Sequence, residues 1–132
     1  MAIADALGLP VAVGIASASP HEITLVEETL DNAFIADAIR KLIGDRAYDS
    51  DRLDEKLWEE REVELIAAHR KNRQNLTQDG RPLRRAKRRW KVERLFAWLH
   101  NYRRLVIRWE RHAENFLGFV QLGCMCILFR HY

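Results

Sequence analysis

The stretch Leu42-Ile43-Gly44-Asp45-Arg46-Ala47-Tyr48-Asp49 decides the fold, because an apolar run changes to a polar turn within a few residues. We expect a short buried strand that begins at Ala38 and ends near Gly44, then a loop. A helix capped by Ser50 or Asp51 follows the loop. A strand that leads directly into a helix is typical of layered α/β folds. The stretch therefore predicts an α/β protein with Asp45 just beyond the end of a strand.

The chain on either side alternates in the same way. Upstream, residues 1–4 and 11–16 read as the two strands of a hairpin, and Ile23, Val26, Leu30 and Phe34 have helical spacing. Downstream we expect a helix with Leu53, Leu57 and Trp58 on one face, a strand over 63–67, a basic amphipathic helix over 84–100 with Val92, Phe96 and Leu99 on one side, and a buried helix over 113–129. The order β-β-α-β-α-β-α-α predicts a mixed α/β layer fold.

Charge is distributed unevenly along the chain. The net charge is only +3, but residues 1–68 carry 6 basic and 15 acidic residues, whereas residues 69–111 carry 15 basic and 3 acidic. A block with a net charge of +12 indicates a polyanionic partner. The longest apolar stretch, residues 116–129, is shorter than the roughly 20 residues of a membrane span. Two cysteines exclude a disulfide framework, and the start has no basic region typical of a signal peptide. We expect a cytoplasmic, bacterial chain of one domain, without a membrane.

Two carboxylates are candidates for chemistry. Asp45 follows a predicted strand, and ligand sites in α/β sheets lie at the carboxyl ends of strands. Gly44 allows a sharp turn or a close approach there. The alternative is that Asp45 caps the next helix or lies in a surface loop, although Asp49 and Asp51 fit the capping role better than Asp45 does. Glu93 is the only acid between Gly80 and Glu110. Either it pairs with Arg89 at i−4, or it is a metal ligand flanked by phosphate-binding cations.

The two candidates fit one reaction. Phosphodiester chemistry with Mg²⁺ uses two or three carboxylates, and two metal ions about 3.5–4 Å apart can bind the attacking and leaving oxygens. Trp90 and Trp98 could stack on a base, but an aromatic residue on an amphipathic helix also commonly packs in a core. Cys124 and Cys126 are expected to be core residues.

Three blocks carry a resemblance to a known family. Residues 44–50 (GDRAYDS), residues 70–73 (RKNR) and residues 88–105 (RRWKVERLFAWLHNYRRL) resemble the C-terminal half of bacterial insertion-sequence transposases of the DDE superfamily, insertion-sequence families four and five in particular. The resemblance covers nearly the whole chain. It implies an RNase-H-like mixed sheet flanked by helices, Mg²⁺ or Mn²⁺ as cofactor, and DNA cleavage and strand transfer at terminal repeats and a target.

The resemblance also implies roles for individual residues. Asp45 matches the second acid of the catalytic triad and Glu93 the third, so both would be catalytic metal ligands. Arg89 matches the family's characteristic arginine, Ala86 stands where the family usually has Tyr, and His100 stands at a usually basic position. The DNA-binding side chains implied are those of Arg84, Arg85, Lys87, Arg88, Arg89, His100, Arg103 and Arg104.

The first acid of the triad has no match. Asp5 corresponds to a turn, so we expect an N-terminally truncated catalytic domain whose first strand is missing and whose sheet has an unpaired edge. We predict that residues 1–132 alone do not cut or join DNA. An upstream-frame polypeptide or a second copy of a transposase could supply the missing acid. The alternative is a non-catalytic DNA-binding remnant or a regulatory partner subunit of a split transposase.

Overall fold

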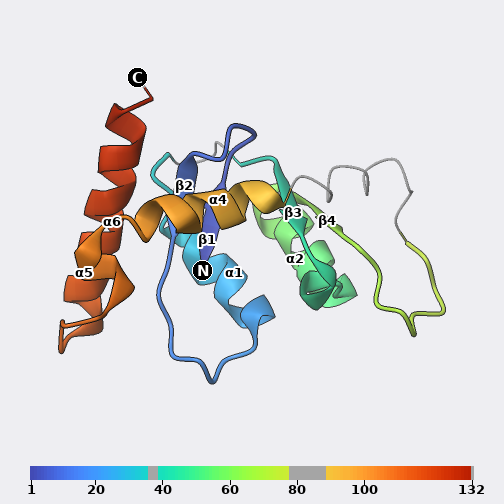
Figure 1. Cartoon of the computed structure of the whole chain (residues 1–132). Helices are drawn as coiled ribbons and strands as arrows, with labels where there is room; N and C mark the ends of the chain where they lie inside the picture. The colour runs from blue at the N-terminus through green and yellow to red at the C-terminus, as the bar shows by residue number, and fades with distance from the viewer. Residues whose placement is uncertain (36–38, 78–88, 132) are drawn as a thin grey trace. The chain divides into compact units, whose positions relative to one another are not determined.

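The computed structural model describes residues 1–35, 39–77 and 89–131 and forms two compact units. The first unit comprises Met1–Pro20, Thr24–Phe34 and Lys91–Tyr132, and the second comprises His21–Ile23 and Ile35–Trp90. Each unit contains one small sheet and at least one helix (Figure 1).

The first unit is built on an antiparallel hairpin of β1 (Ala2–Ala4) and β2 (Pro10–Val13). Asp5 closes its turn, because its Oδ1 accepts hydrogen bonds from the backbone N–H groups of Leu7 and Leu9, each at 2.8 Å. Gly8 adopts φ +82°, a conformation that favours glycine. The prediction that Asp5 occupies a turn is therefore confirmed.

Helices complete the first unit. Helix α1 (Leu25–Asp31) belongs to this unit, whereas the 3-10 turn before it, η1 (Glu22–Thr24), has Glu22 and Ile23 in the second unit. The C-terminal part of the chain forms α4 (Trp90–Leu99), the short α5 (Arg103–Val106) and the long α6 (Ala113–Phe129). Lys91 and Arg94 of α4 donate hydrogen bonds to the carbonyl oxygens of Ala6 and Leu7 in the hairpin turn. These two cations therefore help to hold α4 against the hairpin.

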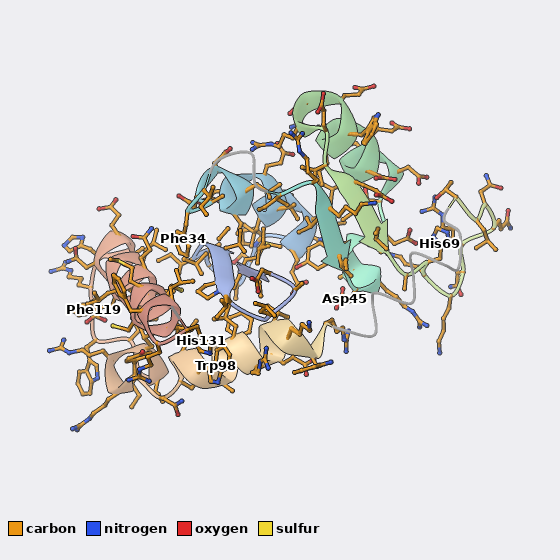
Figure 2. All side chains as sticks on the ribbon, turned by 90° about the horizontal axis from the view of Figure 1, so that it is seen from above. Phe34, Asp45, His69, Trp98, Phe119 and His131 are labelled. Carbon is orange, nitrogen blue, oxygen red and sulfur yellow. The ribbon has the colours of Figure 1, made fainter. Side chains whose placement is uncertain are left out.

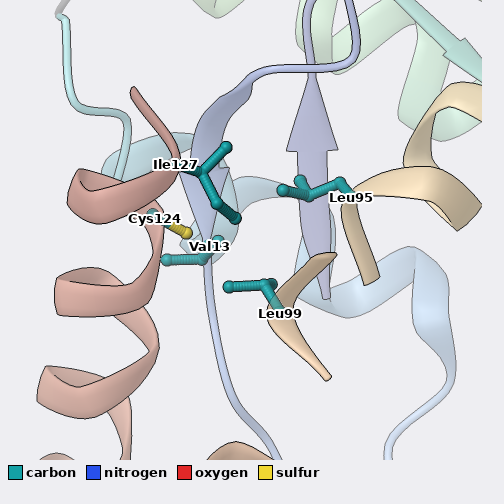
Figure 3. Packing of buried hydrophobic residues seen from close by; sticks show 5 residues of the cluster. All are labelled: Val13, Leu95, Leu99, Cys124 and Ile127. Atoms are coloured by element: carbon teal, nitrogen blue, oxygen red, sulfur yellow. The ribbon is translucent and has the colours of Figure 1, made fainter. Parts of the chain in front are cut away.

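The core of this unit joins β2, α4 and α6. Val13, Leu95, Leu99, Cys124 and Ile127 pack together, and each is at most 5% exposed (Figure 3). The spacings i, i+4 on α4 and i, i+3 on α6 place each pair on one helical face. Burial raises the pKa of Cys124 to about 11. The thiol therefore stays protonated at neutral pH and acts as a packing group, as the sequence predicts.

The second unit is a β-α-β crossover. Strands β3 (Lys41–Gly44) and β4 (Glu64–Ala67) run parallel, with Leu42 opposite Leu65. A 3-10 turn, η2 (Arg46–Tyr48), and helix α2 (Asp51–Arg61) connect them. Ser50 is the N-cap of α2 and accepts a hydrogen bond from the Leu53 N–H at 3.4 Å. Because the strands are parallel, the chain leaves both of them at the same edge of the sheet.

The predicted order of elements is confirmed, with α5 as an additional short helix. The mixed α/β class is also confirmed. Among the described residues the strands form two separate two-stranded sheets, so a single RNase-H-like sheet stays a prediction. The part of the predicted basic helix before residue 89 lies outside the described residues, as does the start of the predicted strand at Ala38.

Several predictions of burial are wrong. Strand β3 is not buried, because Lys41 and Ile43 are exposed. Trp58 and Phe96 were expected to face a core, but they are 61% and 41% exposed. Helix α6 was expected to be buried all round, yet only Gly123, Cys124 and Ile127 are buried, because α6 packs through one side against β2 and α5. Its exposed apolar residues are Phe119, Leu122, Met125 and Phe129.

In the part of the chain that the structure describes, every helix falls short of the length and apolar character that crossing a membrane requires.

Candidate functional site

Asp45 lies at the carboxyl end of β3, as predicted, and its two carboxylate oxygens have different surroundings. Oδ1 accepts the backbone N–H of Ala47 at 2.8 Å, so Asp45 is the N-cap of η2. Oδ2 faces the Arg89 Nη1 at 3.6 Å. The side chain is 44% exposed. Asp45 therefore acts as a cap, of the 3-10 turn η2 and not of the helix α2, and its second oxygen lies beside a cation.

Gly44 is required by the ring of Tyr48. A Cβ at position 44 would meet the Tyr48 Cδ2 at 2.9 Å, closer than real Cβ contacts. The prediction of a close approach at Gly44 is confirmed. Burial, together with the negative charges of Glu22 and Asp45, raises the pKa of Tyr48 to about 12. The phenol therefore stays neutral, and its packing fixes the turn that carries Asp45.

Asp49 makes contacts that the capping role expected from the sequence does not include. Its side chain is 3% exposed. Oδ1 lies 3.0 Å from the His69 Nδ1 and accepts a hydrogen bond from the Arg73 Nη1 at 2.6 Å, while Oδ2 accepts the Arg70 N–H at 2.8 Å. Burial alone would raise the pKa of Asp49, but these hydrogen bonds and the charge of Arg73 outweigh it, so the pKa lies below its ordinary value. Asp49 is therefore a buried carboxylate anion.

Asp49 fixes the segment that follows β4, which we call the β4 loop (residues 69–77). The loop leaves the sheet at the same edge as Asp45, and Figure 2 shows Asp45 and His69 beyond the ends of β3 and β4. His69 and Arg70 follow the end of β4 by two and three residues. This polar sequence directly after a strand, in the same position as Asp45 after β3, is the signal that could have predicted the loop.

Glu93 is the fourth residue of α4 and is exposed. Ala97 and His100, which share its helical face by spacing, are also exposed. Arg89 immediately precedes the helix and forms its ion pair with Asp45 in the second unit, whereas Glu93 belongs to the first unit. The structure thus brings Asp45 and Arg89 together. A metal site shared by Asp45 and Glu93 stays a prediction.

The two tryptophans differ in their surroundings. Trp90 is 49% exposed. Trp98 packs against the core of the first unit, and its ring contacts the Arg94 guanidinium at 4.8 Å and the His131 ring at 5.1 Å between centroids. Figure 2 labels Trp98 and His131 beside each other. The packing interpretation of Trp98 is therefore confirmed.

The predicted DNA-binding cations are only partly described. Arg103 and Arg104 are exposed on α5, and Arg104 forms an ion pair with Glu110 at 3.3 Å while lying 5.5 Å from the centre of the Phe119 ring. The predicted residues Arg84, Arg85, Lys87 and Arg88 lie outside the described residues.

The metal-binding capacity of the described part of the chain is limited. Asp45 supplies a hard carboxylate oxygen of the kind that Mg²⁺ prefers. Within residues 1–35, 39–77 and 89–131, however, no group of three or more His, Cys, Asp or Glu side chains is placed to hold a metal ion. Asp45 therefore fits a metal as one ligand.

Comparison with known proteins identifies the class. The family model described as "Transposase DDE domain" matches residues 1–129, and the chain belongs to this family. A curated relative, "Putative transposase for insertion sequence element IS402" from Burkholderia cepacia, is 35% identical over 133 residues. The match covers 95% of this chain and 59% of the relative, so the chain spans less than two thirds of that protein. No solved structure matches significantly.

Proposed function

We propose that the chain is part of the catalytic domain of a metal-dependent DNA transposase, with DNA as its substrate in the bacterial cytoplasm and residues 1–132 belonging to one RNase-H-like domain. The observation that carries the proposal is the position of Asp45. Within a chain of the DDE family, an exposed carboxylate oxygen follows a parallel strand and lies 3.6 Å from a guanidinium nitrogen of Arg89. Such an arrangement pairs a metal ligand with a cation that can bind phosphate.

Asp45 and Glu93 are proposed as ligands of Mg²⁺, with Mn²⁺ as a substitute. Chain connectivity supports this assignment, because Arg89 pairs with Asp45 and Glu93 follows Arg89 by four residues. The metal would supply Lewis-acid activation of the phosphodiester. The chain's own residues would position it: Arg89 and His100 would orient phosphates, and Arg103 and Arg104, with Arg84, Arg85, Lys87 and Arg88, would bind the DNA backbone.

A third carboxylate is not assigned in this sequence, since Asp5 closes the hairpin turn. We therefore propose that residues 1–132 do not cleave DNA alone and that the first acid is supplied from outside these residues, for example by an upstream-frame product or a second transposase copy. The test is nicking of terminal-repeat DNA with Mg²⁺ by the chain, with and without an added polypeptide that carries the upstream region. Nicking only in the mixture, lost on Asp45→Asn or Glu93→Gln, is the expected result.

Two outcomes would contradict this proposal. Robust nicking by residues 1–132 alone would show that the site is complete. Nicking in the mixture that survives both substitutions would remove Asp45 and Glu93 from the site. Lys41→Gln is a suitable control variant, because Lys41 lies at the opposite end of β3 and is exposed.

A second candidate is a non-catalytic DNA-binding remnant or a regulatory partner of a transposase. The basic block of residues 69–111, with 15 basic and 3 acidic residues, is sufficient for it. This alternative would be supported by a DNA affinity that rises steeply as the salt concentration falls and is unchanged by EDTA, together with no Mg²⁺ binding in calorimetry. Mg²⁺ binding that is lost on Asp45→Asn would support the catalytic proposal.

A further inference from the structure

The β4 loop (residues 69–77) is closed by its own side chains. The His69 Nε2 accepts the Thr77 N–H at 3.2 Å. Arg73 donates to the Asn75 carbonyl oxygen at 2.6 Å and to the Thr77 Oγ1 at 3.1 Å. Asp49 then holds the His69 ring, the Arg70 N–H and the Arg73 guanidinium together. The loop is therefore a fixed element with a buried anion at its base.

This organisation separates the cations of the loop into two groups. Arg73 is directed inward and is 14% exposed, because its guanidinium serves Asp49, Asp51 and the loop itself. Arg70 and Lys71 are exposed. The Arg70 guanidinium is held in place by the carbonyl oxygens of Arg46 at 3.3 Å and Ala47 at 3.2 Å. No described residue forms a hydrogen bond or ion pair with the Lys71 ammonium in residues 1–35, 39–77 and 89–131.

The outward face of the loop suits an extended anion. The sequence from His69 to Thr77 contains three cations and no acid, and its Asn and Gln side chains at positions 72, 74 and 75 are exposed. Arg46, exposed at the end of the neighbouring strand, adds a cation beside Arg70. Ammonium and guanidinium groups with neutral amides are the side chains that contact DNA phosphates.

We propose that the β4 loop binds the phosphodiester backbone of DNA through Lys71 and Arg70, and that Asp49 is the positioning residue that holds the loop for this contact. The proposal rests on DNA as the partner given under the proposed function. It assigns a DNA contact to the carboxyl ends of β3 and β4, in addition to the basic residues from position 84 onward. The contact reads the backbone, so it is independent of base sequence.

The experiment measures binding of a DNA duplex by the chain in EDTA, so that catalysis plays no part. Lys71→Gln is compared with Lys41→Gln, the same change at the opposite ends of the β3–β4 sheet. Loss of one phosphate contact lowers the salt slope by about 0.9, which corresponds to roughly eightfold weaker binding at 0.1 M salt and about fourfold at 0.2 M. We expect this loss for Lys71→Gln and an unchanged slope for Lys41→Gln. Equal effects of the two variants, or no effect of Lys71→Gln, would overturn the proposal.

The positioning role of Asp49 is tested by a double-mutant cycle. If Asp49 holds the loop for DNA, Lys71→Gln should weaken binding much less in an Asp49→Asn background than in the native chain. Full additivity would show that Asp49 is only structural. Should Asp49→Asn fail to fold, Arg70→Gln, a variant at an exposed position of the loop, is measured in its place, and an unchanged salt slope for Arg70→Gln would also count against the loop.

These results separate the two proposals. Nicking that depends on Asp45 while Lys71→Gln binds normally would reject the loop contact and leave the proposed function intact. DNA binding that is weakened by Lys71→Gln, with no nicking in any mixture, would support the loop contact and reject the proposed function.

Discussion

Two aspartates bind the same arginine, and their different burial makes a sharp prediction. Asp49 and Asp51 both form ion pairs with Arg73, but their side chains are 3% and 63% exposed. Replacing Asp49 by alanine would leave a nearly buried guanidinium and the Arg70 N–H without their anion. Breaking a buried pair from one side costs about 3–5 kcal/mol.

The matched change Asp51→Ala should cost far less. An exposed ion pair contributes about 0–1 kcal/mol, and an acid in the first turn of a helix adds about 0.3–1 kcal/mol. We therefore expect less than about 2 kcal/mol for Asp51→Ala. Each variant removes one ion pair of Arg73, so the difference in unfolding free energy between the two variants reports the burial of the carboxylate.

Urea unfolding followed by circular dichroism measures both variants. With an m-value of about 1–3 kcal/mol/M, a loss of 4 kcal/mol lowers the midpoint by more than about 1 M. Asp51→Ala should shift it by less than half as much. Equal shifts for the two variants, or a larger one for Asp51→Ala, would refute the idea that Asp49 is a buried clamp.

Three further predictions follow from the same contacts. Because folding lowers the pKa of Asp49 from 3.8, the carboxylate contributes its full stabilisation above that pH and loses it as the pH falls through the lower pKa of the folded state. The difference in unfolding free energy between the native chain and Asp49→Asn should therefore be constant above about pH 5 and become smaller in acid. A difference that stays constant at every pH would contradict this. Gly44→Ala should cost about 1–3 kcal/mol through the contact with Tyr48, and a double variant with Tyr48→Ala should not show an additive loss. On α6, Ile127→Ala should lower the unfolding free energy by about 2–5 kcal/mol and Met125→Ala by no more than about 0.5 kcal/mol. The reason is burial, because Ile127 is 3% exposed and Met125 is 49% exposed. Similar decreases of the melting temperature in the two variants would show that the packed face of α6 is wrongly assigned.

The order of helices and strands could be predicted because it depends on local periodicity. The bounds of α6 agree with the sequence prediction, since a long and mostly apolar stretch is a local feature. Burial could not be predicted in the same way. Trp58 and the apolar residues of α6 satisfy the pattern of core residues, but only contact with another element removes them from solvent. Their exposure is a property of tertiary packing.

The candidate site could be predicted only for residues whose location follows from their immediate neighbours in the sequence. Asp45 follows a strand and precedes a turn, so its location at the sheet edge could be inferred from its neighbours. The partners of Asp49 lie 20 to 24 residues away, on the loop after β4. A cap at position 49 was a reasonable local interpretation, because nothing local shows that the return of the chain would bury the carboxylate.

The two aspartates at the end of β3 therefore divide the work of the turn. Four residues apart in the chain, Asp45 is 44% exposed beside Arg89, and Asp49 is 3% exposed beneath the β4 loop. A carboxylate that binds a metal ion gives up its hydrating water when the cation arrives, which requires an accessible oxygen. A clamp must keep its charge in a dry setting, which requires several donors around it. Asp45, which caps η2 through one oxygen, is proposed as a ligand through the other, and the surroundings of Asp49 suit the clamp. Removing one carboxylate at a time should consequently abolish different properties. Asp45→Asn should abolish cation binding, and Asp49→Asn should destabilise the β4 loop.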